Sequence, residues 1–297
     1  MEVLTKYRPV SRIVEALQTV EGDGVPIRRV FPARAIEDID PFLLLDEMGP
    51  LELAPGSHVG FPDHPHRGFE TVTYVLEGQM EHRDSCGNHG ILGPGDVQWM
   101  TAGAGLVHSE MPGSELQRTG GRLHGFQLWV NLPRQDKMVE PQYQELPGSR
   151  IPAAWDAARR VEVRILAGES LGGRARIQTR TPIEFLHFTL QPGGRHQQNV
   201  PQGWNAFAYV IDGEVDFGAK SGPLAAGHLA LFSRDGDAVT LSNSADAARS
   251  ASALLIAGAP MGEPVARYGP FVMNTRDEIV QAVDDYRHGR MGTIALR

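Results

Sequence analysis

The chain has 297 residues, of which 41% are hydrophobic, a composition that is typical of a folded globular protein with material for two ordinary domains. Its formal net charge of −8, without a Lys/Arg-rich run, argues against direct binding to nucleic acid or to an anionic membrane surface. The N-terminal MEVLTKYRPV lacks an apolar signal stretch, and no segment approaches the ~20 apolar residues of a membrane span. Cys86 is the only cysteine, so no intramolecular disulfide can form, and we expect a cytoplasmic protein.

Strand-forming residues dominate the chain from end to end. Runs of Val, Ile, Tyr, Phe and Trp alternate with clusters of Gly, Pro, Asp and Asn, and they predict strands at Thr71–Leu76, Val97–Thr101, Gly125–Val130, Val161–Leu166, Glu184–Leu190, Ala206–Ile211, Leu229–Phe232 and Ala253–Ala257. The dipeptides Glu77-Gly78 and Asp212-Gly213 fall where hairpin turns are expected. The pattern predicts an all-β protein built from barrels or sandwiches.

Two segments depart from this strand pattern. Residues 131–151 are polar, contain three prolines and show no periodicity, which indicates a linker, so we expect domains at 1–135 and 136–297. Thr275 and Glu278 form a capping box at the start of a predicted helix that Gly289 ends. Its apolar face is predicted to contain Ile279, Val280, Val283 and Tyr286. This short C-terminal helix is assigned to the second domain.

The two halves of the chain resemble each other. TyrValLeuGluGly at 74–78 matches TyrValIleAspGly at 209–213, and Gly95-Asp96-Val97 matches Gly227-His228-Leu229, which indicates a duplicated barrel. The same alignment places Asn199, Pro201, Thr240 and Ser242 opposite His64, His66, His108 and Glu110. We therefore predict that the second half has lost every metal ligand of the first.

Those four residues of the first half form two spaced pairs. FPDHPHRGFETV contains His64-x-His66, and TAGAGLVHSE contains His108-x-Glu110. Residues i and i+2 of a strand project from the same face, so two such pairs on neighbouring strands would direct four ligands to one point. Three imidazoles and a carboxylate suit Fe(II), Mn, Ni, Cu or Zn better than Ca or Mg. Four protein ligands leave open coordination positions, which favours a catalytic over a structural site.

Other readings of the histidines remain available from the residues alone. Either pair by itself is compatible with a solvated strand face. His82, Cys86 and His89 surround an Asp-Ser-Cys-Gly-Asn turn and lack a fourth partner, so we predict an exposed loop rather than a zinc site. The second half carries histidines without paired spacing, which we interpret as surface or packing residues: His187, His196 and His228.

Long motifs give the chain a family resemblance. FPDHPHRGFETVTYVLEG, GPGDVQWMTAGAGLVHSEMP, PFLLLDEMGP and RYGPFVMNTRDEI closely resemble the pirin family of the cupin superfamily. The resemblance implies a bicupin, that is, two tandem antiparallel β-barrels of the double-stranded β-helix type, with one iron in the N-terminal barrel. It implies that the metal ligands are His64, His66, His108 and Glu110. Glu70, which takes the glutamate place of the general cupin motif, is by the same resemblance not a ligand.

The resemblance also implies a function. Some pirins resemble quercetin 2,3-dioxygenases, which implies a flavonol substrate, O₂ and one transition metal, Fe(II) first, with Mn, Ni, Cu, Co or Zn as alternatives. Glu110 is then the expected base, and Phe61, Arg67 and Asp46 are expected around the pocket mouth, although each is also compatible with packing or a surface salt bridge. The alternative is a non-enzymatic, redox- or metal-responsive regulator that binds a protein partner, either a transcription factor or a metabolic enzyme. The sequence leaves open the choice between them, the physiological substrate and the oligomeric state.

Overall fold

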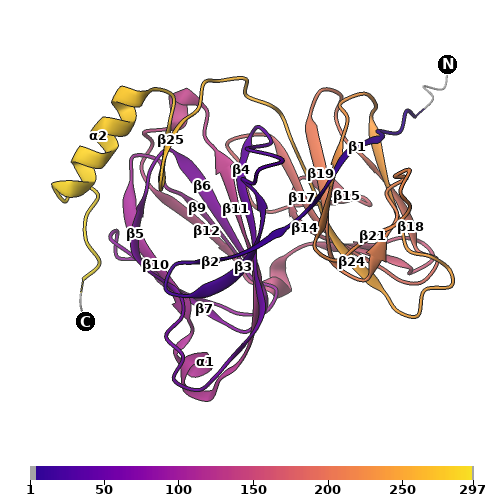
Figure 1. Ribbon diagram of the computed structural model, residues 1–297, viewed down its shortest axis with the longest axis horizontal. Coiled ribbons are helices and arrows are strands. Elements are labelled where there is room, and N and C mark those ends of the chain that lie inside the picture. The colour runs from indigo at the N-terminus through magenta and orange to yellow at the C-terminus, as the bar shows by residue number, and fades with distance from the viewer. Residues whose placement is uncertain (1–4, 296–297) are drawn as a thin grey trace. The chain divides into compact units, whose positions relative to one another are not determined.

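A computed structural model describes residues 5–295, which form two compact units (Figure 1). The first unit contains Leu17–Arg150 and the C-terminal segment from Met261, and the second contains the chain through Ala16 and Ile151–Pro260. The division therefore differs from the predicted boundary between residues 135 and 136. The break in the middle of the chain follows residue 150. The N-terminal segment belongs to the second unit and the C-terminal segment to the first, the reverse of the prediction.

The first unit is built on a seven-stranded antiparallel sheet. Its order is β12 (Gln142–Leu146), β9 (Val97–Thr101), β6 (Phe69–Glu77), β11 (Gly121–Asn131), β4 (Phe42–Leu53), β3 (Val25–Phe31) and β2 (Leu17–Glu21). A four-stranded sheet runs β5 (Phe61–His66), β10 (Leu106–Pro112), β7 (Met80–Asp84) and β8 (His89–Leu92). The remaining elements are α1 (Ser114–Thr119), the 3₁₀ turns η1 (Arg134–Asp136) and η2 (Gly148–Arg150), β25 (Ala266–Tyr268), β26 (Phe271–Met273) and α2 (Arg276–Arg287).

The second unit repeats this architecture. Its seven-stranded sheet runs β1 (Val10–Glu15), β22 (His228–Phe232), β19 (Asn205–Asp212), β24 (Ala251–Gly258), β17 (Ile183–Leu190), β14 (Val161–Ala167) and β13 (Ala153–Trp155). Shorter pairs are β18 (Arg195–Asn199) with β23 (Ala238–Ser242), β20 (Glu214–Val215) with β21 (Leu224–Ala225), and β15 (Glu169–Ser170) with β16 (Gly173–Arg174). The order β22-β19-β24-β17-β14-β13 has the same connectivity as β9-β6-β11-β4-β3-β2, which confirms the duplication. Only the edge strands β1 and β12 differ, because β1 precedes the other strands of its sheet in the chain and β12 follows those of its own.

The eight predicted strands are all present, because their apolar residues face a closed core. In β14 the alternate residues Val161, Val163 and Ile165 are fully buried, and they join the facing residues of β17, β19 and β24 in one apolar cluster. Burial of each such side chain stabilises the fold by roughly 1.5–3 kcal/mol. Both predicted hairpin turns are also confirmed: Gly78 and Gly213 have φ of 81° and 73°, a conformation that costs glycine little.

The segment predicted as a linker belongs instead to the first unit. Its strand β12 pairs with β9 from Gln142↔Thr101 to Leu146↔Val97. Lys137 is buried, and its Nζ donates hydrogen bonds to Gly68 O at 2.8 Å, Asn131 Oδ1 at 2.7 Å and Val272 O at 3.0 Å. Gly68 and Val272 are 69 and 135 residues from Lys137 in the sequence, and such long-range partners leave no trace in the local sequence. The linker prediction is wrong for this reason.

These three contacts give a stability prediction. Lys137→Met is expected to lower the free energy of unfolding by about 3 kcal/mol, because it leaves buried acceptors without a donor. Lys220→Met, at an exposed lysine, is the matched control and is expected to change it by less than about 0.5 kcal/mol. Chemical denaturation followed by fluorescence measures both. Equal stabilities of the two variants would show that the ammonium group contributes nothing.

The N-terminal strand β1 packs in the second unit, and the C-terminal helix α2 packs in the first. β1 pairs with β22 at the edge of the second unit's sheet, and Figure 1 shows this indigo strand beside the orange strands. The helix α2 begins with the predicted Thr275–Glu278 capping box, and its residues Ile279 and Ala282 are buried in a cluster with Val107 of the first unit. Val280 is 67% exposed, so its predicted place on the apolar face is wrong. In the part of the chain that the structure describes, neither helix is long and apolar enough to cross a membrane.

Candidate metal centre

Three histidines meet on the four-stranded sheet of the first unit. His64 and His66 lie on β5, and His108 lies on the adjacent β10, directly opposite His64. One ring nitrogen from each lies within 4.8 Å of the others. The ring centroid of His108 is 4.3 Å from that of His64 and 4.9 Å from that of His66. The predicted convergence of the two pairs is therefore present for all three imidazoles.

Backbone carbonyls orient two of these rings. His64 Nδ1 lies 2.7 Å from Pro62 O, and His66 Nδ1 lies 3.5 Å from Pro270 O. Because a carbonyl oxygen can only accept, both contacts favour the tautomer with the proton on Nδ1, which leaves the Nε2 lone pair free to bind a metal. Burial, with a contribution from His64, holds the pKa of His66 and of His108 well below the usual range. Both rings are thus kept in the neutral form that metals bind.

Glu110 lies beside the histidines with its carboxylate fixed. Its Oε1 accepts a hydrogen bond from the Thr73 hydroxyl at 2.8 Å, and its Oε2 accepts one from the Gln127 amide at 3.1 Å. The same Oε2 is 3.9 Å from His108 Nε2. The strand register shifts between His108 and Glu110 where β10 pairs with β5, while the pairing with β7 stays regular. The carboxylate therefore borders the cluster without belonging to its tight group of three nitrogens.

The residues fit a bound metal ion. His108 is fully buried, and neither of its ring nitrogens has a hydrogen-bond partner within residues 5–295. A buried imidazole without partners carries a desolvation penalty, which a coordinate bond would offset. Three neutral imidazoles with a neighbouring carboxylate form a donor set for borderline first-row metals.

A cavity of about 540 Å³ opens onto the cluster. It is lined by Glu21, Gly22, Asp23, Arg29, Leu44, Asp46, Met48, Phe61, Pro62, Asp63, His64, His66, Glu110, Gln127, Trp129, Arg267, Gly269 and Pro270. Arg29 pairs bidentately with Asp46 at 2.9 and 2.7 Å, and the Arg267 guanidinium lies 5.0 Å from the centre of the Trp129 ring. Burial raises the pKa of Asp46, although Arg29 opposes the shift. The cavity thus combines aromatic walls with two cationic groups.

Of the residues expected at the pocket mouth, Phe61 and Asp46 line this cavity and Arg67 does not. The Arg67 side chain is buried elsewhere: its Nε donates to Ala104 O at 2.6 Å and its Nη1 pairs with Asp285 of α2 at 2.7 Å. Adjacent residues of an extended chain point in opposite directions, so Arg67 faces away from the site that its neighbour His66 faces. Glu70 is also buried outside the cavity and accepts a hydrogen bond from Thr101.

The surroundings of the lone cysteine were predicted only in part. Cys86 is exposed in a turn, as expected of a loop, whereas His89 is exposed but lies at the start of strand β8. His82 is instead fully buried on β7, with its ring centroid 5.3 Å from that of His108 and 4.9 Å from that of Tyr143. The prediction was wrong for His82 because even-numbered residues of β7 face the barrel interior.

The strand register shows what replaces the cluster in the second unit. Glu81 in the first unit and Asp216 in the second are equivalent, because each follows the glycine of its hairpin turn by three residues. Met111 pairs with Glu81, and Ser242 pairs with Asp216, so Met111 and Ser242 are equivalent as well. The interior positions equivalent to His64, His66, His108 and Glu110 are therefore Gln198, Val200, Val239 and Leu241.

Each of these positions lies one residue before the counterpart predicted from sequence, namely Asn199, Pro201, Thr240 and Ser242. A slip of one residue exchanges the two faces of a strand, so the predicted counterparts are not the interior ones. The conclusion drawn from them is unaffected, since the residues described in the second unit contain no metal-binding cluster.

Several residues of the site had no signal strong enough to identify them. Thr73, Gln127 and Trp129 reach it from β6 and β11, and only their alternation along predicted strands indicated an inward direction. Arg29 and Arg267 reach the cavity from opposite ends of the first unit's sequence, and nothing local links them.

Two repeated barrels, of which one contains a cluster of histidines at its open end, define a bicupin. A family model for pirin matches residues 24–130, and one for the pirin C-terminal cupin domain matches residues 185–292. The chain is 48% identical to pirin-like protein 2 of Arabidopsis thaliana over 96% of this chain and 86% of that protein. It is 46% identical to pirin of Homo sapiens over 96% and 94% of the two chains. The chain belongs to the pirin family.

A solved structure is also similar over the whole chain. The crystal structure of a quercetin 2,3-dioxygenase from Acinetobacter baumannii matches with a TM-score of 0.90 and 35% sequence identity, covering 98% of this chain and 100% of that chain. The bicupin architecture is therefore shared with a protein that bears the name of an enzyme.

Proposed function

We propose that the protein is a metal-dependent dioxygenase of the pirin type that opens the heterocyclic ring of quercetin-like flavonols with O₂. The observation that carries the proposal is the cluster of His64, His66 and His108, of which His64 and His66 line a cavity with aromatic walls. The likeness to a quercetin 2,3-dioxygenase supports it. The reaction balances without a further reductant, since one ring carbon leaves as carbon monoxide and both atoms of O₂ stay in the ester product.

We assign the metal-holding role to the three imidazoles and Glu110, with Fe(II) as the metal. Such an ion, when bound, would polarise the 3-hydroxyl of the flavonol and supply the redox chemistry for O₂. The donor set is also suited to Mn, Ni, Cu, Co or Zn. One site per chain is expected, because the equivalent interior positions of the second unit carry no such side chains.

The chain's own groups would handle the proton and the substrate. Glu110 is assigned as the base for the flavonol 3-hydroxyl, and the bonds from Thr73 and Gln127 hold it in place while leaving a lone pair on each oxygen. Phe61 and Trp129 offer flat surfaces to a planar polyphenol and exclude water. Arg267 would stabilise the flavonolate anion by its charge.

Oxygen uptake tests the proposal directly. Protein loaded with Fe(II) is expected to consume one O₂ for each quercetin and to release one carbon monoxide, and the chelator-treated protein is expected to do neither. An oxygen electrode and gas analysis measure the two stoichiometries. If no consumption occurs with any of the six metals, the enzyme proposal fails and the alternative of a regulator that binds a protein partner takes its place.

A further inference from the structure

The second unit contains a cavity at the place where the first unit has its metal site. It has a volume of about 980 Å³, and Gln198, Val200 and Glu184 are among the residues that line it. Gln198 and Val200 are the counterparts of His64 and His66. Glu184 is the counterpart of Leu44, because Glu184 pairs with Ala257 of β24 as Leu44 pairs with Trp129 of β11, and these two residues occupy equivalent positions opposite β19 and β6. All three counterparts line the cavity of the first unit. The duplication has therefore kept the cavity while changing its chemistry.

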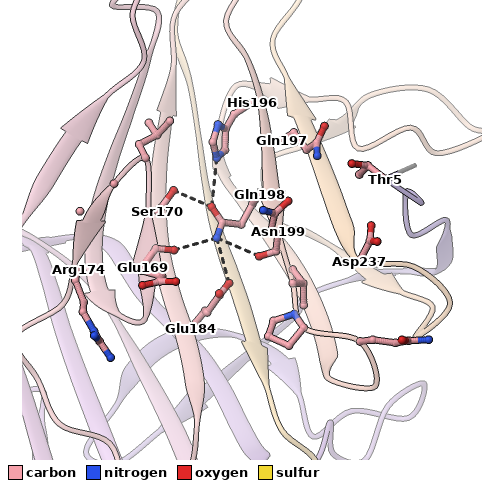
Figure 2. Close-up of a pocket in the computed structure, with 16 residues that line it drawn as sticks. Thr5, Glu169, Ser170, Arg174, Glu184, His196, Gln197, Gln198, Asn199 and Asp237 are labelled. Carbon is pink, nitrogen blue, oxygen red and sulfur yellow. Dashed lines mark hydrogen bonds between the residues drawn. The ribbon is translucent and has the colours of Figure 1, made fainter. Parts of the chain in front are cut away.

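Gln198 is held rigidly at the centre of this second cavity (Figure 2). Its Oε1 accepts a hydrogen bond from the Ser170 hydroxyl at 2.7 Å and lies 3.3 Å from His196 Nε2. Its Nε2 donates to the backbone oxygens of Glu169 at 3.0 Å and Asn199 at 3.2 Å. The amide thus has little capacity left for a ligand, and its contacts fix the floor of the cavity.

Glu184, unlike Gln198, has few hydrogen-bond partners. Its side chain is more than nine-tenths buried and points toward Gln198 in Figure 2. Among residues 5–295, the only hydrogen bond that it receives is a long one, 3.4 Å from Gln198 Nε2. Its Oε1 has no hydrogen-bond partner among the residues that the structure describes. A buried carboxyl in place of a leucine is costly for packing alone. Burial raises its pKa to about 7, with Gln198 and Arg8 opposing the shift and Glu169 adding to it.

The other charges around the cavity are mainly negative. Glu169 and Asp237 line it together with Glu184, against the guanidinium of Arg174 on the neighbouring β16 and that of Arg8, whose charge acts on Glu184 and Asp237. The uncharged lining groups near the floor are hydroxyls and amides already engaged with one another. A ligand that donates hydrogen bonds and carries a positive charge would match these acceptors, whereas an anion would meet an excess of carboxylates.

We propose that the cavity of the second unit binds a small organic cation whose primary ammonium group donates to the Glu184 carboxylate. The site is separate from the histidine cluster and does not depend on the function proposed for it. The ammonium supplies the donor that Oε1 lacks, and it favours the ionised form of the buried carboxyl.

Three probes of equal length test the chemistry by isothermal titration calorimetry on the full chain: 1,4-diaminobutane, 1,4-butanediol and succinate. The diamine is expected to bind at least tenfold more tightly than the diol, and succinate is expected to bind more weakly than either. A chelator in the buffer excludes contributions from metal ions. Equal binding of diamine and diol, tighter binding of succinate, or no measurable binding of the diamine would overturn the proposal.

Matched variants locate the site. Glu184→Gln keeps the shape of the side chain and is expected to weaken diamine binding at least tenfold, since it removes an ionic hydrogen bond. Glu214→Gln, at an exposed carboxylate outside this cavity, is expected to leave the affinity unchanged. Unchanged affinity in Glu184→Gln would place the diamine elsewhere and contradict the assignment.

The affinity for the diamine is also expected to depend on pH. The charged and titratable groups around Glu184 are Glu169, Arg174, His196 and Asp237, which line the cavity, and Arg8 of the N-terminal segment. Burial lowers the pKa of His196, which disfavours the charged form of its ring. With the pKa of Glu184 about 7, binding at pH 6 is expected to be about tenfold weaker than at pH 8, because a proton competes with the ammonium. Glu184→Gln should lose this dependence, and a wild type without it would contradict the role of the carboxyl.

Discussion

His108→Ala is expected to abolish tight metal binding, lowering the affinity by more than about 100-fold. Loss of an outer-shell contact alone typically costs 10–100-fold, and this change removes a ligand itself. The structure gives the ring nitrogens of His108 no hydrogen-bond partner among the described residues, so both are available for coordination. Elemental analysis of the purified variant after gel filtration measures the loss. His64→Ala and His66→Ala are expected to behave in the same way, because each offers one nitrogen to the same point.

The control for this series is the lone cysteine. Cys86→Ser is expected to retain one metal per chain, since Cys86 is exposed and lies outside the cluster. A thermal readout adds a second test: metal at 100 times its Kd should stabilise the wild type by about 2.7 kcal/mol and leave His108→Ala unchanged. Metal loss in Cys86→Ser with retention in His108→Ala would refute the assigned site, and two tightly bound metals per wild-type chain would refute the asymmetry between the units.

Glu110→Gln carries the second large effect. Under the dioxygenase proposal it removes the base while keeping the size of the side chain, so turnover of quercetin is expected to fall by about 10² or more at matched metal content. The amide also replaces a carboxylate that receives hydrogen bonds from Thr73 and Gln127, so affinity for the metal is expected to fall as well. Oxygen uptake, normalised to bound metal, separates the two consequences.

Glu70→Gln is the matched control, because Glu70 is a buried glutamate of the same barrel that does not line the cavity. We expect it to change turnover per metal by less than twofold. Turnover that survives unchanged in Glu110→Gln would exclude the proposed base. If Glu70→Gln lost the metal and Glu110→Gln kept it, the carboxylate ligand would be Glu70 and not Glu110.

The sequence predicted the parts of this structure that are local in the chain. Strands with buried alternating residues, the turns at Gly78 and Gly213 and the capping box at Thr275 each depend on neighbours a few residues away. The spacing of His64 and His66 likewise needs only the geometry of one strand. These features are therefore present as expected.

The errors concern partners that are distant in sequence. Arg67 follows a metal-site residue directly, yet it turns to Asp285, which is 218 residues further along. The polar segment around Lys137 looked like a linker because two of the acceptors of its ammonium group, Gly68 O and Val272 O, are 69 and 135 residues away in the sequence. In the second unit a slip of one residue was enough to place Asn199 inward instead of Gln198. Local patterns contain no information on any of these.

The exchange of the two chain ends between the units has a consequence for biosynthesis. His66 contacts Pro270, and Arg267 lies over Trp129, so the cavity of the first unit is completed by residues that the ribosome adds after the whole of the second unit. The edge strand β1 is made first and finds its partner β22 only more than 200 residues later. A gene cut between codons 150 and 151 would give two fragments that each lack a piece of their own barrel, and neither could serve as an independent half.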